Sequence, residues 1–218
     1  PTPTPSPQTQ SINDYLDTVV AIYCRQNGSL ISGSGFITAR SDGYYVASNQ
    51  HVLGAVSDTC FAEYFDNSSR LVATILLNDK AWVVTGQHAD ADFALRKIDS
   101  VAGETEYIPV TSLPEVNSIT DLCSTQVAIG TEVYTIGFPS YANGSRILTE
   151  GTITGYDYVH YSDNPNYFIS ATIDAGSSGG LAYARENGEL CILGQPTWIS
   201  VGTYASSGVV QNMHTIKW

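Results

Sequence analysis

The sequence has few basic residues. Nine Lys and Arg side chains stand against 21 Asp and Glu, which gives the 218-residue chain a formal net charge of −12 at pH 7. A polyanion would meet a repulsive average field around such a protein. Nucleic acid is therefore not an expected partner.

Long apolar runs are also missing. The longest clear one, from Leu71 to Leu77, is interrupted by Thr74, whereas a membrane-spanning helix needs about 20 apolar residues. The sequence therefore predicts no membrane span. With 43% hydrophobic and 14% charged residues, the chain has enough apolar side chains for one large or two small cores, and too little charge for a disordered protein.

No Cys-x-x-Cys pair is present to indicate a zinc or redox motif. The four cysteines, Cys24, Cys60, Cys123 and Cys191, lie far apart. Their even number predicts two disulfides and an extracellular, periplasmic or cell-envelope location, and four buried free thiols are the alternative. Four cysteines allow three pairings, among which the sequence does not choose.

The first ten residues, PTPTPSPQTQ, alternate Pro with Thr or Ser. This pattern is typical of an extended, semi-rigid linker. We therefore interpret residues 1–10 as a linker and residues 11–218 as the folded domain. A linker at this place leads us to expect a preceding signal or anchor segment that tethers the protein.

Strand-forming sequence is plentiful, and the fold is predicted to be all-β. Runs rich in β-branched and aromatic residues, bounded by Gly, Pro, Asn or Asp, predict strands at 18–24, 29–38, 43–49, 70–77, 81–85, 92–98, 131–138, 146–159, 166–173, 180–186, 190–201 and 207–212. Between Ile98 and Glu132 only short apolar pieces occur, which is typical of a connection between two barrels or sheets. Short helices are expected only after His51, at 52–55, and at the C-terminus, 210–218.

The segment DAGSSGG, residues 174–180, concentrates small residues ahead of an apolar run. A tight turn is the simplest interpretation. The alternative is that the turn displays the Ser178 hydroxyl among free backbone N–H groups, which is the geometry of a nucleophile with its oxyanion hole. A serine nucleophile needs a base, and His51 lies directly after an apolar strand, where a side chain is both held and exposed. The other histidines, His88, His160 and His214, are interpreted as solvated.

A catalytic histidine needs a carboxylate on its other ring nitrogen, to fix the tautomer and to stabilise the imidazolium. Asp92 directly precedes the apolar stretch FAL, so we expect it to be half-buried and bonded, whereas Asp90 is expected to be solvated. A metal site of His88, Asp90 and Asp92 is a weaker alternative, because no further ligands are evident.

Five motifs in this order resemble the trypsin/chymotrypsin superfamily of serine proteases. They are GSGFI (33–37), ASNQHVL (47–53), DFALRKI (92–98), GTEVYTIGFP (130–139) and DAGSSGGL (174–181). Within the superfamily they are most similar to the HtrA/Deg branch and similar bacterial trypsin-like peptidases, and the resemblance covers about residues 18 to 215. We interpret the GSG at 33–35 as close backbone packing rather than a phosphate loop, because a strand follows it.

This resemblance implies two six-stranded antiparallel β-barrels, at about 18–100 and about 125–210, with a short C-terminal helix. It implies a serine endopeptidase with its active site between the barrels, acting on protein or peptide substrates without a cofactor or metal. His51 matches the general base, Asp92 the orienting acid and Ser178 the nucleophile. The N–H groups of Gly176 and Ser178 match the oxyanion hole.

The resemblance also places the primary specificity pocket at 171–173, 194–197 and 206–209. Its candidate substrate-binding residues are Thr172, Gln195, Pro196, Thr197 and Ser207. None of them offers a carboxylate floor for a basic side chain, so a small or medium apolar P1 residue is predicted.

Two departures and two alternatives remain open. Ser177 stands where digestive members of the superfamily have an aspartate that pairs with a new N-terminus, so the site is expected to be formed by the fold itself. The given sequence ends at Trp218 without the peptide-binding domain that many HtrA-like proteins carry, so we expect either the catalytic part of a longer protein or a protein that lacks this domain. The alternative functions are a catalytically silent binding protein of the same fold and a glutamyl-type endopeptidase.

The protein is expected to be a monomer or a trimer, with Ile12, Tyr15 and Leu16 available for packing against a neighbour.

Overall fold

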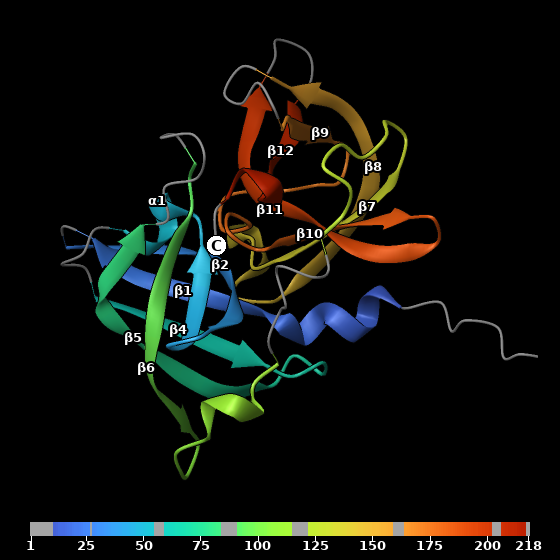
Figure 1. The fold of residues 1–218 in the computed structure, drawn as a ribbon. Coiled ribbons are helices and arrows are strands. Elements are labelled where there is room, and N and C mark those ends of the chain that lie inside the picture. Colours follow the sequence, from blue (N-terminus) through green and yellow to red (C-terminus); the bar gives the residue numbers. More distant parts are fainter. Residues whose placement is uncertain are drawn as a thin grey trace, which may run out of the picture.

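The structure is a computed structural model that describes residues 11–26, 28–54, 59–83, 91–114, 122–158, 164–201 and 206–216. Its strands form two closed antiparallel barrels, which lie side by side (Figure 1). The first barrel has the order β1 (Val19–Gln26), β2 (Ser29–Arg40), β3 (Gly43–Ser48), β6 (Ala94–Gly103), β5 (Leu71–Val83) and β4 (Thr59–Phe65). The second has the order β10 (Leu181–Glu186), β11 (Glu189–Val201), β12 (Ser206–Asn212), β9 (Asn166–Ile169), β8 (Ile147–Asp157) and β7 (Glu132–Gly137). The predicted pair of six-stranded barrels is confirmed.

Strand β1 is an almost continuous apolar run because it is buried on both faces. Successive side chains of a strand point to opposite faces. Val20 and Ile22 lie in the core of the first barrel, whereas Val19 and Ala21 lie in a different cluster that both barrels share. Both faces of β1 are therefore buried, and both must be apolar.

The shared cluster lies between the barrels. It joins Phe36 and Phe93 of the first barrel to Ile136, Leu181 and other residues of the second. Each barrel also has an apolar cluster of its own. The barrels are thus fixed against each other by apolar packing, which gives a site between them a rigid frame.

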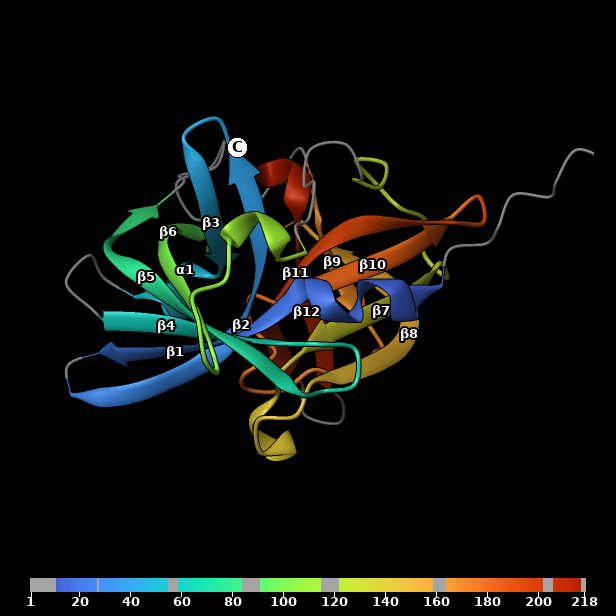
Figure 2. The ribbon, with the colours of Figure 1, turned by 90° about the horizontal axis from the view of Figure 1, so that it is seen from below.

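The N-terminal segment covers this shared cluster. It forms a 3-10 helix, η1 (Ile12–Thr18), in which Ile12 is buried and the rings of Tyr15 and Tyr183 have centroids 4.9 Å apart. Figure 2 shows η1 beside β7 and β10 of the second barrel. Ile12, Tyr15 and Leu16 pack against their own chain, with Ile12 buried and the other two partly buried. The expectation that this segment contacts a neighbouring molecule stays a prediction.

Several elements differ from the sequence-based prediction. Strand β4 was not predicted, and β5 is one strand where two were expected. The predicted C-terminal helix is reduced to the 3-10 helix η4 (Met213–Thr215), because the residues up to Asn212 belong to β12. The turn after the third strand is a short helix, α1 (Gln50–Leu53). Two further 3-10 helices are η2 (Val110–Ser112) and η3 (Ser140–Ala142).

The prediction of two disulfides is confirmed, and the structure gives the pairing. Cys24 bonds to Cys60 across the paired strands β1 and β4. Cys123 bonds to Cys191 of β11. Each disulfide therefore lies within one barrel. As predicted, none of the helices in the described part of the chain is long and apolar enough to cross a membrane.

Candidate active site

Two neighbouring strands bring His51 and Asp92 to the same end of the first barrel. Strands β3 and β6 pair, with Ser48 opposite Ala94. His51 follows β3 on helix α1, and Asp92 precedes β6 by two residues. In an antiparallel pair, the end of one strand lies beside the start of its neighbour. The two side chains therefore meet although 41 positions separate them in the sequence.

Asp92 uses both carboxylate oxygens to hold His51. Its Oδ2 lies 2.5 Å from Nδ1 of the His51 ring, and its Oδ1 accepts the backbone N–H of His51 at 3.0 Å. The Asp92 side chain is only 15% exposed, whereas that of His51 is 48% exposed. The carboxylate is thus fixed in the protein, and the ring that it orients reaches solvent.

The loop of Asp92 is anchored in turn by amide side chains. Asn49 donates from Nδ2 to the Asp92 carbonyl at 2.7 Å, and Gln211 accepts the Asp92 backbone N–H on Oε1 at 2.9 Å. Gln211 belongs to β12 of the second barrel and is fully buried. The position of Asp92 is therefore set by both barrels.

The turn around Ser178 displays free N–H groups. Gly176 and Gly179 have φ values of +90° and +84°, which favour glycine. The turn is closed by Ser177, whose backbone N–H donates to the Asp174 carbonyl and whose side-chain oxygen accepts the Asp174 N–H. Within the described ranges, the N–H groups of Gly176 and Ser178 donate to no protein acceptor. This backbone offers two donors close together beside the Ser178 hydroxyl.

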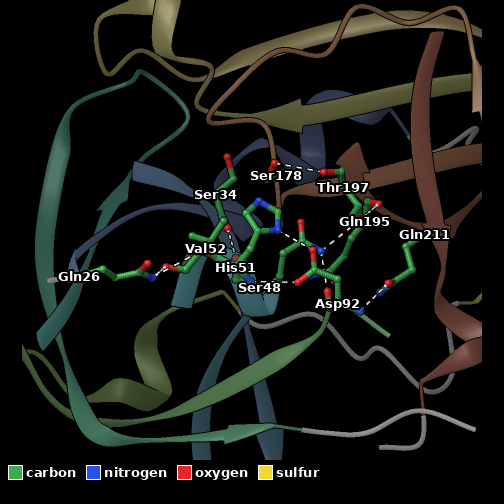
Figure 3. A network of polar contacts seen from close by, with 11 residues as sticks. Gln26, Ser34, Ser48, His51, Val52, Asp92, Ser178, Gln195, Thr197 and Gln211 are labelled. Carbon is green, nitrogen blue, oxygen red and sulfur yellow. Dashed lines mark hydrogen bonds and ion pairs between the residues drawn. The ribbon is translucent and has the colours of Figure 1, made fainter. Parts of the chain in front are cut away.

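Ser178 and His51 face each other across the junction of the barrels. A Cβ atom built on Gly179 would lie 2.9 Å from the backbone nitrogen of Asn49, two residues before His51. In Figure 3 the His51 ring lies between Asp92 and Ser178. The Ser178 hydroxyl donates to the Thr197 carbonyl at 3.5 Å, and no hydrogen bond joins it to His51 in the described structure.

A pocket opens directly beside Ser178. Its lining residues are Ile173, Asp174, Ala175, Ser177, Ser178, Pro196, Thr197, Trp198 and Ile199. Two of the predicted substrate-binding residues, Pro196 and Thr197, belong to this lining. Ile173, Trp198 and Ile199 make the pocket largely apolar. The carboxylate of Asp174 accepts the N–H of Ala175 at 2.8 Å, so it is already bonded within its own turn.

The other three predicted pocket residues lie elsewhere. Gln195 is fully buried and donates from Nε2 to the Gly179 carbonyl at 3.2 Å. Thr172 is exposed, and its carbonyl accepts the Thr149 hydroxyl. Ser207 pairs with Ser200 between β12 and β11. None of the three is among the residues that line the pocket.

Four polar residues of the site were not predicted from the sequence. Asn49 and Gln211 hold Asp92, and Ser34 and Ser48 bond to the backbone beneath the Ser178 turn. All four are fully buried. A usable signal was present, because a polar side chain in an otherwise apolar strand needs a hydrogen-bond partner when it is buried. In the GSG motif, Gly35 is confirmed as a site of close packing, since a Cβ there would lie 2.7 Å from the Ala47 carbonyl.

The remaining histidines and the metal hypothesis fall largely on residues that the structure does not describe. His88, Asp90 and His160 lie outside the described residues. His214 is half-buried, with Nε2 2.7 Å from the Cys123 carbonyl, so its interpretation as a solvated side chain is wrong. In the described parts of the chain, the one group with metal-ligand spacing is Cys123, Glu186 and Cys191. Both of those sulfurs are consumed by a disulfide.

Comparison with protein families agrees with the fold. A model described as the trypsin-like peptidase domain matches residues 33–191, more than half of the 218-residue chain. The chain belongs to the trypsin-like peptidase family. The family predicted from the sequence motifs is therefore confirmed. No curated protein sequence matches the chain.

Solved structures similar to this trypsin-like peptidase domain include several proteases. The serine endoprotease from Yersinia pestis is 24% identical with a TM-score of 0.59, and the match covers 90% of this chain and 59% of that one. The HtrA-type protease AlgW with tripeptide is 19% identical with a TM-score of 0.62, over 92% of this chain and 59% of that one. A protease from M. tuberculosis in its active form is 19% identical with a TM-score of 0.62, over 99% of this chain and 86% of that one. At these identities the likeness establishes the fold.

Proposed function

We propose that this trypsin-like peptidase domain is a serine endopeptidase that cleaves peptide bonds through an acyl-enzyme. The observation that carries the proposal is the carboxylate of Asp92 bonded to both Nδ1 and the backbone N–H of His51, with the His51 ring between Asp92 and Ser178 (Figure 3). A solvated surface histidine would need no such two-point support. Family membership supports the same conclusion.

In the proposed reaction, Ser178 is the nucleophile and His51 the general base. The Ser178 hydroxyl rotates from the Thr197 carbonyl toward Nε2 of His51, gives its proton to that nitrogen and attacks the scissile carbonyl. Asp92 keeps the Nδ1 proton of the ring in place and stabilises the imidazolium that forms. His51 then returns its proton to the leaving amine. A water molecule repeats the sequence on the acyl-enzyme and releases Ser178.

The negative oxygen of each tetrahedral intermediate is bound by the N–H groups of Gly176 and Ser178. Both groups lack a protein acceptor within the described ranges, so neither has to break a bond before it can donate. Donors that are aimed in advance at the developing charge lower the barrier without reorganisation, and the loss of one donor typically costs about 10²–10³-fold in rate.

The pocket lining supports a small or medium apolar P1 residue. Ile173, Trp198 and Ile199 supply apolar surface, and the nearest carboxylate, that of Asp174, is bonded to the Ala175 N–H. A glutamyl-type specificity is less well supported, because no Lys, Arg or His is among the described lining residues. The two disulfides fit an extracellular or periplasmic location.

Labelling with an organofluorophosphonate probe tests the proposal directly. We expect one adduct, located by mass spectrometry on Ser178, and no labelling of Ser178→Ala. Hydrolysis of peptide p-nitroanilides with Ala, Val, Lys or Glu at P1 then measures specificity, and we expect the highest kcat/KM for Ala or Val. Folded wild-type protein that takes up no probe would instead support the silent binding protein.

A further inference from the structure

Ser34 connects the first barrel to the proposed oxyanion hole of the second. It lies on β2, within the GSG motif, and is fully buried. Its hydroxyl donates to the Gly176 carbonyl at 2.6 Å and accepts the Phe138 N–H at 2.8 Å. Its backbone N–H donates to the Ser178 carbonyl at 2.9 Å. Ser34 therefore holds the turn at both residues that supply oxyanion donors.

We propose that Ser34 is a positioning residue that keeps the oxyanion hole formed, a role that rests on the proposed endopeptidase function. A peptide unit is planar, so fixing a carbonyl also fixes the N–H of the following residue. Ser34 fixes the units that carry the carbonyls of Gly176 and Ser178. These two units flank the one that carries the Ser178 N–H. The orientation of the peptide unit that carries the Ser178 N–H is thus restrained by the units on both sides of it.

The Gly176 N–H is held by a neighbouring contact. It belongs to the peptide unit whose carbonyl, that of Ala175, accepts the N–H of Ser140 at 2.7 Å. Ser140 follows Phe138 by two residues, and the Ser34 hydroxyl bonds the N–H of Phe138. One buried hydroxyl therefore ties the turn of Ser178 to the segment that supports it from the other side.

Bonds within the turn act on the same peptide units, since the Ser177 N–H donates to the Asp174 carbonyl and the Ser177 carbonyl accepts the Gly180 N–H. Ser34 adds an anchor from outside the turn, at a glycine. Gly176 has a φ of +90° and no side chain, so its own backbone preference does not fix the carbonyl direction. Ser34 itself is firmly placed, since its carbonyl accepts the Ser48 hydroxyl at 2.6 Å. A Cβ on Gly137 would lie 3.0 Å from Ser34 Oγ, so the glycine at that position leaves room for the hydroxyl to reach the turn.

The hydroxyl of Ser34 is the replaceable part of this arrangement. A serine hydroxyl has one proton to donate and lone pairs to accept, and Ser34 uses both functions. Alanine removes both and keeps the backbone bond to Ser178. Cysteine keeps a side chain of similar shape with a weaker donor. The variants Ser34→Ala and Ser34→Cys therefore form a graded series.

Thr215→Val is the matched control. Thr215 is also fully buried, and its hydroxyl donates to a backbone carbonyl, that of Asn212, at the same 2.6 Å. It lies in η4 and bonds to none of the candidate site residues. Valine removes this hydroxyl and keeps the side-chain shape. The control therefore measures the loss of one buried hydroxyl bond without a change in the turn of Ser178.

The experiment measures kcat and KM for an Ala p-nitroanilide, binding of a peptide boronic acid that forms a tetrahedral adduct, and the melting temperature. For Ser34→Ala we expect kcat to fall about tenfold or more and boronate affinity to fall by a similar factor, because the oxyanion donors are misaimed. KM is expected to stay within about twofold, since Ser34 does not line the pocket. Ser34→Cys should lie between wild type and Ser34→Ala, and Thr215→Val should keep the wild-type kcat.

The outcomes separate this proposal from the one on which it rests. If wild-type protein is active and Ser34→Ala matches Thr215→Val in kcat and boronate affinity, the positioning role is overturned and the endopeptidase function stands. If both variants lose melting temperature equally and only Ser34→Ala loses kcat, the role is supported. Wild-type protein that neither hydrolyses substrates nor takes up the fluorophosphonate probe overturns both.

Discussion

The carboxylate of Asp92 forms hydrogen bonds to His51 at two points, with Oδ2 2.5 Å from the ring Nδ1 and Oδ1 3.0 Å from the backbone nitrogen. The second bond is as informative as the first. It fixes the backbone of His51 relative to Asp92, so the ring can place only its Nδ1 against the carboxylate. The tautomer with the proton on Nδ1 is thereby favoured, which leaves Nε2 as the acceptor.

Asp92→Asn should therefore remove activity without unfolding the protein. The amide can donate to Nδ1 and stabilise the wrong tautomer, and we expect kcat at neutral pH to fall by a factor on the order of 10⁴. Asp42→Asn is the control, because it removes a carboxylate that accepts the Tyr45 hydroxyl at 2.6 Å in the β2–β3 hairpin. Steady-state kinetics with melting curves would contradict the proposed role if both variants kept the same kcat.

Two glycines with the same backbone angle test the shape of the oxyanion turn. Gly176 and Gly188 have φ values of +90° and +89°. A Cβ on Gly176 would lie 3.0 Å from the Ser140 nitrogen, whereas a Cβ on Gly188 would have no neighbour within 4 Å. Alanine at either site costs about 1 kcal/mol in backbone strain, but only Gly176→Ala must move its loop. We expect its kcat to fall on the order of 10²-fold, with Gly188→Ala unchanged, and equal kcat values in the two variants would argue against a preformed hole.

The size of the P1 pocket should depend on Ile173. This side chain lines the pocket and packs next to Gly208, where a Cβ would lie 2.8 Å from it. Ile173→Ala should raise kcat/KM for Phe relative to Ala at P1 by about tenfold or more, because larger side chains gain room and apolar contact. Val201→Ala, an exposed residue of β11 outside the lining, should leave the ratio unchanged. An unchanged ratio in Ile173→Ala would show that P1 is bound elsewhere.

Acid should weaken the β4–β5 turn through Asp66. The Ser68 hydroxyl, together with the N–H groups of Arg70 and Ser68, lowers the pKa of Asp66 to about 2. The pKa is lower in the folded state, so the ionised carboxylate stabilises the fold above its ordinary pKa of about 4, and this contribution is lost as the pH falls toward 2. Urea unfolding of wild type and Asp66→Asn at several pH values should give midpoints that differ at pH 5 and converge near pH 2. A constant difference would contradict this account.

The sequence predicted most of the fold because the strands are locally encoded. Strand β4 was not predicted, although TCFAEYF has four β-branched or aromatic residues and stands between two aspartates. Its stability comes from pairing with β1 and β5, which is information from distant parts of the chain. The predicted C-terminal helix was longer than the observed one, because the tertiary hydrogen bond from the Asp92 N–H to the Gln211 side chain holds Gln211 in β12.

The residues of the candidate triad could be predicted from the order of the motifs, whereas the residues that line the pocket could not. The pairing of β11 with β12 shifts register between Pro196 and Trp198. Such a bulge changes which side chains face the site, because the strict alternation of a strand is interrupted. Gln195, which precedes the shift, is buried, whereas Trp198 and Ile199, which follow it, line the pocket. Pro196 is a local sign of this bulge, because proline within a sheet is confined to edges and bulges, but it does not indicate which side chains then face the site.

The apolar cluster between the barrels has a consequence for how the chain can be cut or rebuilt. Phe36 and Phe93 come from one half and Ile136 and Leu181 from the other, and each is at most marginally accessible to water. An isolated half would present all of this surface to solvent, which favours aggregation over independent folding. The two barrels are therefore expected to fold as one unit, and a half expressed alone is expected to aggregate or to associate with a second half through this surface.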